Sequence, residues 1–426
     1  MNILFVGHDI AYVNFYIAIE SALRQRIELS SLHLYSRPSA WLYSRLLLRL
    51  PSRSPSLIRL FGRWLTYNNT HNEFIDLRFY QASSGANQRY QFERIYKGYF
   101  SFIQKTLSGN DFDLAVLPGE YRLFEQATIA VLESLKRTPQ IIYFEAGPPG
   151  YVYLDKCGVN ANASFANTGV SDLLVNITSQ ITTPTIAHGT LYPLTRKGLL
   201  FLDIMWLWLT KITSGLLDLE EFWVAMKNRL RIHRFKRSKV KDQSDTLLMG
   251  SYIIFIGQVR NDINNTHFGI AEIELEQRLI EILSSDLSIK MIWRDHPLEF
   301  SEKLFQKLSD AFPDRVFRLD KVPLKTLLAS VQGVVTVNSN AGLEALASGL
   351  PVRLLGRSYF SKLQGVCVDN FSFEIFRKKI KESGPDQAIR RDAERFLKEC
   401  FLPIDYRGGD FRNAHLAAEV IISCKI

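Results

Sequence analysis

Short apolar runs alternate with longer amphipathic segments along the first 150 residues of the chain. The apolar runs are short enough to be buried strands, and they lie at 2–6, 27–35, 113–117 and 140–144. The segments with helical spacing lie at 14–24, 42–67, 90–106 and 125–136. Strands and helices in strict alternation predict an α/β domain built on a parallel sheet.

The same alternation begins again after residue 251. Strands are predicted at 252–256, 289–293, 316–317 and 334–337, and helices at 269–284, 302–311, 324–330 and 340–348. Two further helices, at 387–400 and 413–423, would cross back or cover a cleft. We therefore predict two Rossmann-like α/β domains facing a central cleft. The expected boundaries are 1–190 and 246–400 for the two domains, 191–245 for a helical linker and 401–426 for a returning helix.

The composition fits a globular protein of two or three domains. The chain has 426 residues, of which 46% are hydrophobic and 22% charged. Its four cysteines lie far apart, so we expect neither a disulfide framework nor a zinc site, and a reducing cytoplasm fits. The first predicted strand begins at Asn2 without a basic segment before it, so no secretory signal is expected.

The net charge of +9 has a local origin. Eight Lys and Arg residues and no acid lie between 227 and 241, and without them the net charge would be +1. Nucleic-acid binding is therefore not expected. The apolar run 199–209 is too short for a confident membrane span, and a Trp-containing segment at 216–234 follows it. This pattern predicts peripheral attachment to an anionic inner membrane face, or alternatively a helical hairpin between domains.

Polar side chains follow three strands of the second half. The segments are Gln258–Asp262, Arg294–Pro297 and Asn338–Gly342. Because the carboxyl ends of parallel strands lie at one edge of a sheet, these segments should meet. Together they offer a cation, an imidazole, a helix N-terminus and a carboxylate, which suit a nucleotide-sugar site. No acids, His or Cys occur at metal-ligand spacing, so no metal is expected.

The stretch 334–354 predicts a strand, a short helix and another strand. Asn338 and Ser339 have the small polar side chains typical of a helix cap. The free N–H groups at such a terminus favour an anion, so a phosphate near Ser339, Asn340 and Gly342 is one interpretation. A capped crossover helix without a ligand is the other.

The first half also places polar groups after its strands. His8 and Asp9 follow the first strand, Glu120 and Arg122 the third, and Glu145 ends the fourth. There is no GxGxxG after the first strand, so a dinucleotide site is not indicated. His8 and Asp9 contact substrate or cap the following helix, and Glu145 is catalytic or pairs with Arg122.

The second-half motifs resemble those of a known enzyme family. Gln258-Val259-x-x-Asp262, His296-Pro297 and the segment 338–346 are similar to the motifs of bacterial capsule-synthesis glycosyltransferases that transfer Kdo with β stereochemistry. The resemblance covers 252–356 and is weaker before 190, where Glu145-Ala146-Gly147 resembles an acidic strand end. It implies the two-domain GT-B architecture, CMP-Kdo as donor, a retaining mechanism and no cofactor.

The resemblance also implies roles for residues. Asp262 would be the nucleophile, Glu145 the acid/base and His296 a donor contact that helps proton transfer, although the first two roles are interchangeable. Asp262 would otherwise cap a helix or pair with Arg260, and His296 would be structural. The candidate donor-binding residues are Gln258, Arg260, Arg294, His296, Pro297, Asn338, Ser339, Asn340, Gly342 and Glu344. The acceptor-side candidates are His8, Asp9 and Glu120.

The predicted function is transfer of Kdo from CMP-β-Kdo to a glycan or lipid-linked glycan in capsule or lipopolysaccharide O-antigen assembly. A UDP-sugar transferase or epimerase is one alternative, and a non-catalytic capsule assembly or export component is the other. The segment Asn265-Thr266-His267 departs from the family pattern. We expect 1–190 to be the acceptor side and 246–400 the donor side.

Overall fold

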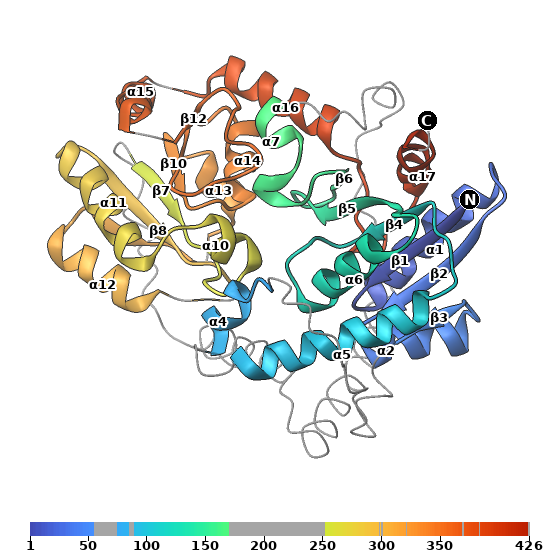
Figure 1. Ribbon diagram of the computed structural model, residues 1–426. Helices are drawn as coiled ribbons and strands as arrows, with labels where there is room; N and C mark the ends of the chain where they lie inside the picture. Colours follow the sequence, from blue (N-terminus) through green and yellow to red (C-terminus); the bar gives the residue numbers. More distant parts are fainter. Residues whose placement is uncertain are drawn as a thin grey trace. The chain divides into compact units, whose positions relative to one another are not determined.

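The computed structural model describes most of the chain in two compact units (Figure 1). The described residues are 1–54, 75–84, 89–169, 252–297, 299, 301–320, 322–368, 370–382 and 384–424. Of these, 1–164 and 398–424 form the first unit, and 165–169 and 252–397 form the second. The predicted linker at 191–245 lies outside the described residues, and so do its apolar and basic segments.

The first unit is built on a six-stranded sheet in the order β3-β2-β1-β4-β5-β6. Its strands are β1 (Asn2–Gly7), β2 (Ser30–Tyr35), β3 (Ser52–Arg53), β4 (Leu114–Leu117), β5 (Gln140–Ala146) and β6 (Val152–Asp155). The first five run parallel and β6 pairs antiparallel with β5. β1 and β4 are almost wholly buried, which explains why their sequences are apolar runs without alternation.

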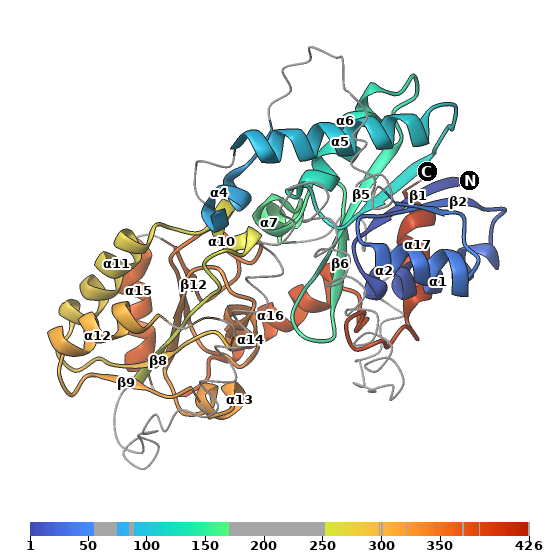
Figure 2. The ribbon, with the colours of Figure 1, turned by 90° about the horizontal axis from the view of Figure 1, so that it is seen from below.

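Helices cover this sheet, and the C-terminal helix is one of them. They are α1 (Ile10–Arg24), α2 (Pro38–Leu42), η1 (Tyr43–Leu47), α4 (Arg78–Ser84), α5 (Arg89–Leu107), α6 (Leu123–Ser134), η3 (Asn160–Asn162) and α17 (Ala414–Ser423). α17 lies beside α1 in both views (Figures 1 and 2). Leu416 and Val420 of α17 share one buried cluster with Phe15 and Ile19 of α1, so the chain end completes the core of the first unit.

The second unit has a fully parallel sheet in the order β12-β11-β10-β7-β8-β9. Its strands are β7 (Tyr252–Ile256), β8 (Lys290–Arg294), β9 (Val316–Arg318), β10 (Gly333–Thr336), β11 (Val352–Leu354) and β12 (Val366–Cys367). Its helices are α7 (Phe165–Thr168), α10 (Ile263–Phe268), α11 (Glu272–Ser285), α12 (Glu302–Ala311), α13 (Leu324–Leu328), α14 (Ala341–Ala347), α15 (Asn370–Lys381) and α16 (Gln387–Cys400). Phe255 and Trp293 lie 4.6 Å apart between ring centroids at the centre of its core.

One predicted helix is wrong over its described part. The helix expected at 42–67 is instead α2, one π-helical turn ending at Leu47, and then the short strand β3. Pro51 has no N–H to continue a helix and disfavours helical backbone at Leu50, which ends the helix early. Residues 55–67 lie outside the described residues.

The predicted fold class is confirmed in both units. Each has a parallel-rich sheet covered by helices, as expected of the Rossmann-like domains of the GT-B class. Among the described residues the unit borders differ from the expected ones in two respects, because α7 belongs to the second unit and residues 398–400 belong to the first. Within the described residues no helix combines the length and apolar character needed to span a membrane.

Candidate functional site

The strand ends at one edge of the second unit's sheet are held together by side-chain hydrogen bonds. β7 lies between β10 and β8, so the segments that follow these strands are neighbours. Gln258 donates through its amide to Asn338 Oδ1, and the Asn338 N–H donates to Gln258 Oε1 at 3.2 Å. The Gly257 N–H donates to the Arg294 carbonyl at 2.8 Å. The predicted meeting of the three segments therefore occurs.

A second pair of hydrogen bonds attaches α10 to this edge. Asn264 Nδ2 donates to the Asn338 carbonyl at 3.2 Å, and Asn338 Nδ2 donates to the Asn264 carbonyl at 3.0 Å. Asn338 is fully buried, so all of its polar groups act inside the protein. The residue therefore positions its neighbours.

Asp262 is exposed at the start of α10. Its carboxylate accepts a long 3.4 Å hydrogen bond from the Asn264 N–H, which is the capping role left open by the sequence. The exposed side chain also presents a carboxylate to solvent at the edge where the strands end. Arg260 is engaged elsewhere, because it pairs with Glu272 at 2.8 Å and with Glu299 at 3.2 Å.

His296 lies half-buried near Asp262. Burial lowers the pKa of the imidazole, and the negative charge of Asp262 partly opposes that effect. The ring is therefore neutral at neutral pH, where it can donate and accept a proton. Pro297 follows it and is exposed, and the Glu299 N–H donates to the His296 carbonyl at 2.9 Å to close the turn.

A buried ion pair fixes the backbone directly before His296. Asp295 pairs with Arg318 and accepts hydrogen bonds from Trp293 Nε1 at 3.0 Å and from the Ser301 N–H at 3.1 Å. Arg294 is half-buried, donates to the Val322 carbonyl, and has its pKa lowered by burial. Sequence reasoning missed Asp295, although an acid directly between a cation and an imidazole at a strand end was a usable signal.

The segment after β10 forms a tight turn into α14. Ser339 Oγ accepts from the Ala341 N–H at 3.3 Å, and the Tyr359 hydroxyl donates to Asn340 Oδ1 at 2.7 Å. A Cβ on the buried Gly342 would lie 2.9 Å from Phe360 Cζ, so the glycine allows close packing. Glu344 is half-buried in the first turn, where burial raises its pKa.

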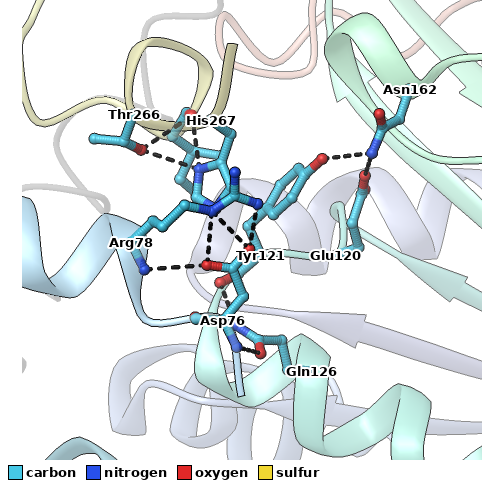
Figure 3. Close-up of polar contacts among 9 residues, drawn as sticks. Asp76, Arg78, Glu120, Tyr121, Gln126, Asn162, Thr266 and His267 are labelled. Carbon is cyan, nitrogen blue, oxygen red and sulfur yellow. Dashed lines mark hydrogen bonds and ion pairs between the residues drawn. The ribbon is translucent and has the colours of Figure 1, made fainter. Parts of the chain in front are cut away.

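The segment Asn265-Thr266-His267, which departs from the family pattern, lies in α10. Figure 3 shows Thr266 beside His267, with the Thr266 hydroxyl 3.0 Å from His267 Nδ1. Asn265 Nδ2 donates to the Arg260 carbonyl at 3.2 Å. These residues therefore build the helix that Asp262 caps.

In the first unit, hydrogen-bond donors surround the Glu120 carboxylate. Its carboxylate accepts from Asn162 Nδ2 at 3.0 Å and from the Val159 N–H at 3.1 Å, and Asn162 also reaches Tyr121 (Figure 3). Burial raises the pKa of Glu120 to about 7, and the charge of Glu145 adds to the rise although the hydrogen bonds oppose it. Glu120 can therefore exchange a proton near neutral pH.

Glu145 lies within β5, one residue before the strand ends. It faces Tyr153 of β6 in register, and its Oε1 accepts from the Ala146 N–H at 2.8 Å. Its negative charge raises the pKa of Tyr12 and Tyr406, after the larger effect of burial on each hydroxyl. The Glu145 carboxylate is therefore close enough to the Tyr12 and Tyr406 hydroxyls to affect both electrostatically.

Asp155 organises the segment that follows β6. This fully buried carboxylate accepts hydrogen bonds from the Cys157 N–H at 2.7 Å and from the Ser164 N–H at 2.9 Å. It thereby shapes the turn that brings Val159 and Asn162 to Glu120. The role of Asp155 was not predicted, although an acid at the end of an apolar strand was a usable signal.

The acceptor-side candidates His8 and Asp9 have different partners. Asp9 caps α1 by accepting from the Ala11 N–H at 2.9 Å, as one interpretation of the sequence expected. His8 is buried, with Nδ1 at 2.6 Å from Ser36 Oγ and Nε2 hydrogen-bonded to Glu125. Glu125 was missed, although an acid in the first turn of the largely apolar helix 123–134 was a visible signal.

Comparison with known protein families shows to which family this chain belongs. The model of the family described as capsule polysaccharide biosynthesis protein matches residues 125–394, which is more than half of the chain. The chain belongs to this family. The predicted resemblance to the capsule-synthesis family is therefore confirmed.

Individual relatives agree with the family. The capsule polysaccharide modification protein LipB of Neisseria meningitidis serogroup A is 23% identical over 307 residues, which cover 66% of this chain and 72% of LipB. The serogroup B LipB is 34% identical over 84 residues, which cover 20% of this chain and 18% of LipB.

Solved structures that match the chain are more distant in sequence. The β-Kdo 2,7 transferase KpsC of Thermosulfurimonas dismutans has a TM-score of 0.36 and 11% identity, covering 76% of this chain and 89% of KpsC. The glycosyltransferase SnogD of Streptomyces nogalater has a TM-score of 0.34 and 10% identity, covering 100% and 99% of the two chains. The family assignment depends on the sequence match and not on these scores.

Proposed function

We propose that the protein is a retaining glycosyltransferase that moves Kdo from CMP-β-Kdo to a glycan or lipid-linked glycan. The acceptor would belong to capsule assembly, or to assembly of a lipopolysaccharide O-antigen. The observation that carries this proposal is the hydrogen-bonded meeting of three strand ends in the second unit, with Asp262 exposed and His296 beside it. Family membership and the motif resemblance support the choice of donor.

The reaction would proceed in two displacements. Asp262 attacks the anomeric carbon of Kdo, and the bond to the CMP oxygen breaks with its electron pair leaving on the phosphate. An acceptor hydroxyl then attacks the same carbon, and the Asp262 carboxylate leaves with its electron pair. The proton of that hydroxyl passes to Glu145.

The departing phosphate needs hydrogen-bond donors and a positive or polarisable partner. Ser339 and Asn340 at the turn before α14, and the neutral His296, are the groups that we propose for this role. Gln258 and Asn338 hold these segments in place. We propose that no metal ion takes part, and that the basic segment 227–241 holds the protein at the inner face of the cytoplasmic membrane.

The covalent step can be tested by mass spectrometry. After rapid quenching with CMP-Kdo, the wild-type protein should carry one Kdo residue on the peptide that contains Asp262. Asp262→Asn should abolish both the adduct and transfer while CMP still binds. Asp310→Asn, at an exposed position of α12, is the matched control and should behave as wild type.

The results would also separate the competing functions. Normal turnover by Asp262→Asn would remove Asp262 as the nucleophile. Turnover of a UDP-sugar, or its epimerisation, would replace the donor while keeping the fold. Failure to bind any nucleotide would favour a non-catalytic role in capsule assembly or export.

A further inference from the structure

The loop after β11 places an arginine at the same sheet edge as the proposed donor residues. β11 pairs in parallel with β10, and the ladder continues past it, because the Gly356 N–H donates to the Val337 carbonyl at 2.9 Å. Arg357 comes next and therefore lies at the carboxyl edge of the sheet, where open α/β sheets bind ligands. The donor-binding candidates predicted from the sequence include no residue of this loop.

Contacts on both sides hold this loop in place. The Arg357 N–H donates to the Phe268 carbonyl at the end of α10, at 2.8 Å. A Cβ on Gly356 would lie 2.6 Å from the same carbonyl oxygen, so the close approach requires a glycine. The Tyr359 hydroxyl donates to Asn340 Oδ1 at 2.7 Å. The loop is therefore attached both to α10 and to the turn before α14.

The guanidinium of Arg357 is exposed, and among the described residues it has no ion-pair or hydrogen-bond partner. Its Cζ lies 5.5 Å from the centre of the Phe268 ring, a contact that favours a cation. Arg260 is instead engaged in two ion pairs, and Arg294 donates to a backbone carbonyl. Arg357 thus keeps its charge and its hydrogen-bond donors for a ligand.

The proposed transfer creates negative charge that needs such a partner. When the bond between the sugar and the phosphate breaks, its electron pair stays on the phosphate oxygen, and the phosphate gains a second negative charge. Ser339, Asn340 and the neutral His296 would supply polar contacts but no positive charge. A cation at this place stabilises the departing phosphate more than the intact donor, and this difference accelerates the reaction.

We propose that the Arg357 guanidinium binds the phosphate of the nucleotide-sugar and stabilises its charge as the sugar leaves. Arginine suits this role because its planar group can donate two hydrogen bonds to phosphate oxygens. Asp262 caps the other end of α10, which has six residues and a length of about 9 Å, so one short helix carries both the proposed nucleophile and the Phe268 ring. The inference rests on the proposed function, to which it adds a charged phosphate ligand.

Calorimetric titrations with CMP and with cytidine isolate the phosphate contact. Arg357→Gln should raise the dissociation constant of CMP about tenfold, the effect of one hydrogen bond to a charged group, and leave that of cytidine unchanged. Because the side chain is exposed, the melting temperature should stay the same. Arg357→Lys keeps the charge without the planar group and should recover part of the affinity. Arg391→Gln, at an exposed position of α16 in the same unit, is the matched control and should bind CMP like the wild type.

The Phe268 ring is tested as the support of the guanidinium. Phe268→Leu should raise the dissociation constant of CMP about two- to fivefold, the value of an exposed contact between a cation and an aromatic ring, and leave that of cytidine unchanged. In the Arg357→Gln background the same substitution should have no further effect. Additive losses would show that the ring does not act through Arg357.

Turnover measures the stabilisation of the departing phosphate. In transfer from CMP-Kdo, Arg357→Gln should lower kcat about tenfold, whereas Arg391→Gln should not change it. Unchanged CMP affinity in Arg357→Gln would overturn the inference and leave the proposed function intact. Unchanged CMP affinity together with a raised KM for CMP-Kdo would also overturn it, because the guanidinium would then contact the carboxylate of the sugar.

Failure of the proposed donor gives a different result. If the wild type binds UDP and not CMP, CMP-Kdo is wrong as the donor, and Arg357→Gln should then weaken UDP binding relative to uridine. Equal UDP affinity in the wild type and the variant would overturn the inference in that case. A wild-type protein that binds neither nucleotide would overturn the inference and the proposed function together.

Discussion

Single residues at the donor-side edge divide into buried groups that hold the backbone and exposed groups that can meet a ligand. Asn338 and Asp295 are buried and bonded to the protein, whereas Asp262 is exposed. The sequence could predict the polar residue types at the strand ends. It could not predict the pairing of Gln258 with Asn338, because the two lie 80 positions apart and only the sheet order makes them neighbours.

Ser339 is the residue whose proposed contact with phosphate is most easily measured. Ser339→Ala should weaken CMP binding by roughly 1–2 kcal/mol, since it removes one charge-assisted hydrogen bond. Calorimetric titration with CMP gives the dissociation constant. Ser348→Ala, at the other end of α14, should bind CMP like the wild type. An unchanged dissociation constant in Ser339→Ala would rule it out as a phosphate ligand.

A second residue-scale prediction concerns acid stability. Glu20 is mostly buried, and burial alone would raise its pKa, but hydrogen bonds from His33 and Arg24 lower it from 4.5 to about 2. A depressed pKa stabilises the fold above pH 4.5, and this stabilisation is lost as the pH falls toward 2. Its size is on the order of 3 kcal/mol.

The test compares free energies of unfolding across that range. Glu20→Gln should destabilise the protein at pH 7, and its difference from the wild type should shrink as the pH falls from 4.5 to 2. Glu93→Gln removes a partly exposed acid paired with Arg89 and should change stability little. A difference for Glu20→Gln that does not vary with pH would contradict the assignment.

At the scale of elements, most of the long periodic segments were predicted well, but the helix expected at 42–67 and several short elements were not. The bounds of α16 match the predicted helix 387–400. α10 was not predicted because its six residues are mostly polar, and the Asp262 cap and the Asn264–Asn338 contacts explain it. β12 was not predicted, since a two-residue strand carries too little pattern, and the 12-residue helix α15 was also missed.

The packing of α14 gives a prediction at this scale. Gly→Ala within a helix usually stabilises it, but a Cβ at Gly342 would meet the Phe360 ring. Gly342→Ala should therefore destabilise the protein by about 1–3 kcal/mol and also weaken CMP binding, because the turn at Ser339 would shift. Denaturant unfolding and calorimetry measure the two effects.

A second substitution tests the cause. Phe360→Leu should make room for the new methyl group, so the double variant should recover part of the loss caused by Gly342→Ala. Two independent, additive losses would show that the contact between these residues is not the reason.

On the scale of the whole molecule, neither unit is one continuous stretch of the chain. Residues 398–424 return to the first unit, where α17 completes its core, and α7 belongs to the second. Two α/β domains could be predicted because the alternation of strand and helix patterns occurs once in each half of the chain. The attachment of α7 depends on long-range packing of Phe165 against Tyr359 and Phe396, which no local pattern shows.

Membrane attachment is the prediction that belongs to this scale. Neutralising Lys236, Arg237 and Lys239 should reduce sedimentation of the protein with anionic vesicles, because basic residues near such a surface contribute about 1 kcal/mol each. Vesicles of neutral lipid are the control and should bind weakly in both cases. Unchanged sedimentation with anionic vesicles would show that this segment is not the anchor.

The central claim is that the second unit binds a CMP-sugar without a metal ion. Calorimetric titration of the full chain with CMP and, in parallel, with UDP, both in the presence of EDTA, tests it most directly. We predict that CMP binds and that UDP gives no heat. Binding of UDP without CMP, or CMP binding that is lost with EDTA, would contradict it.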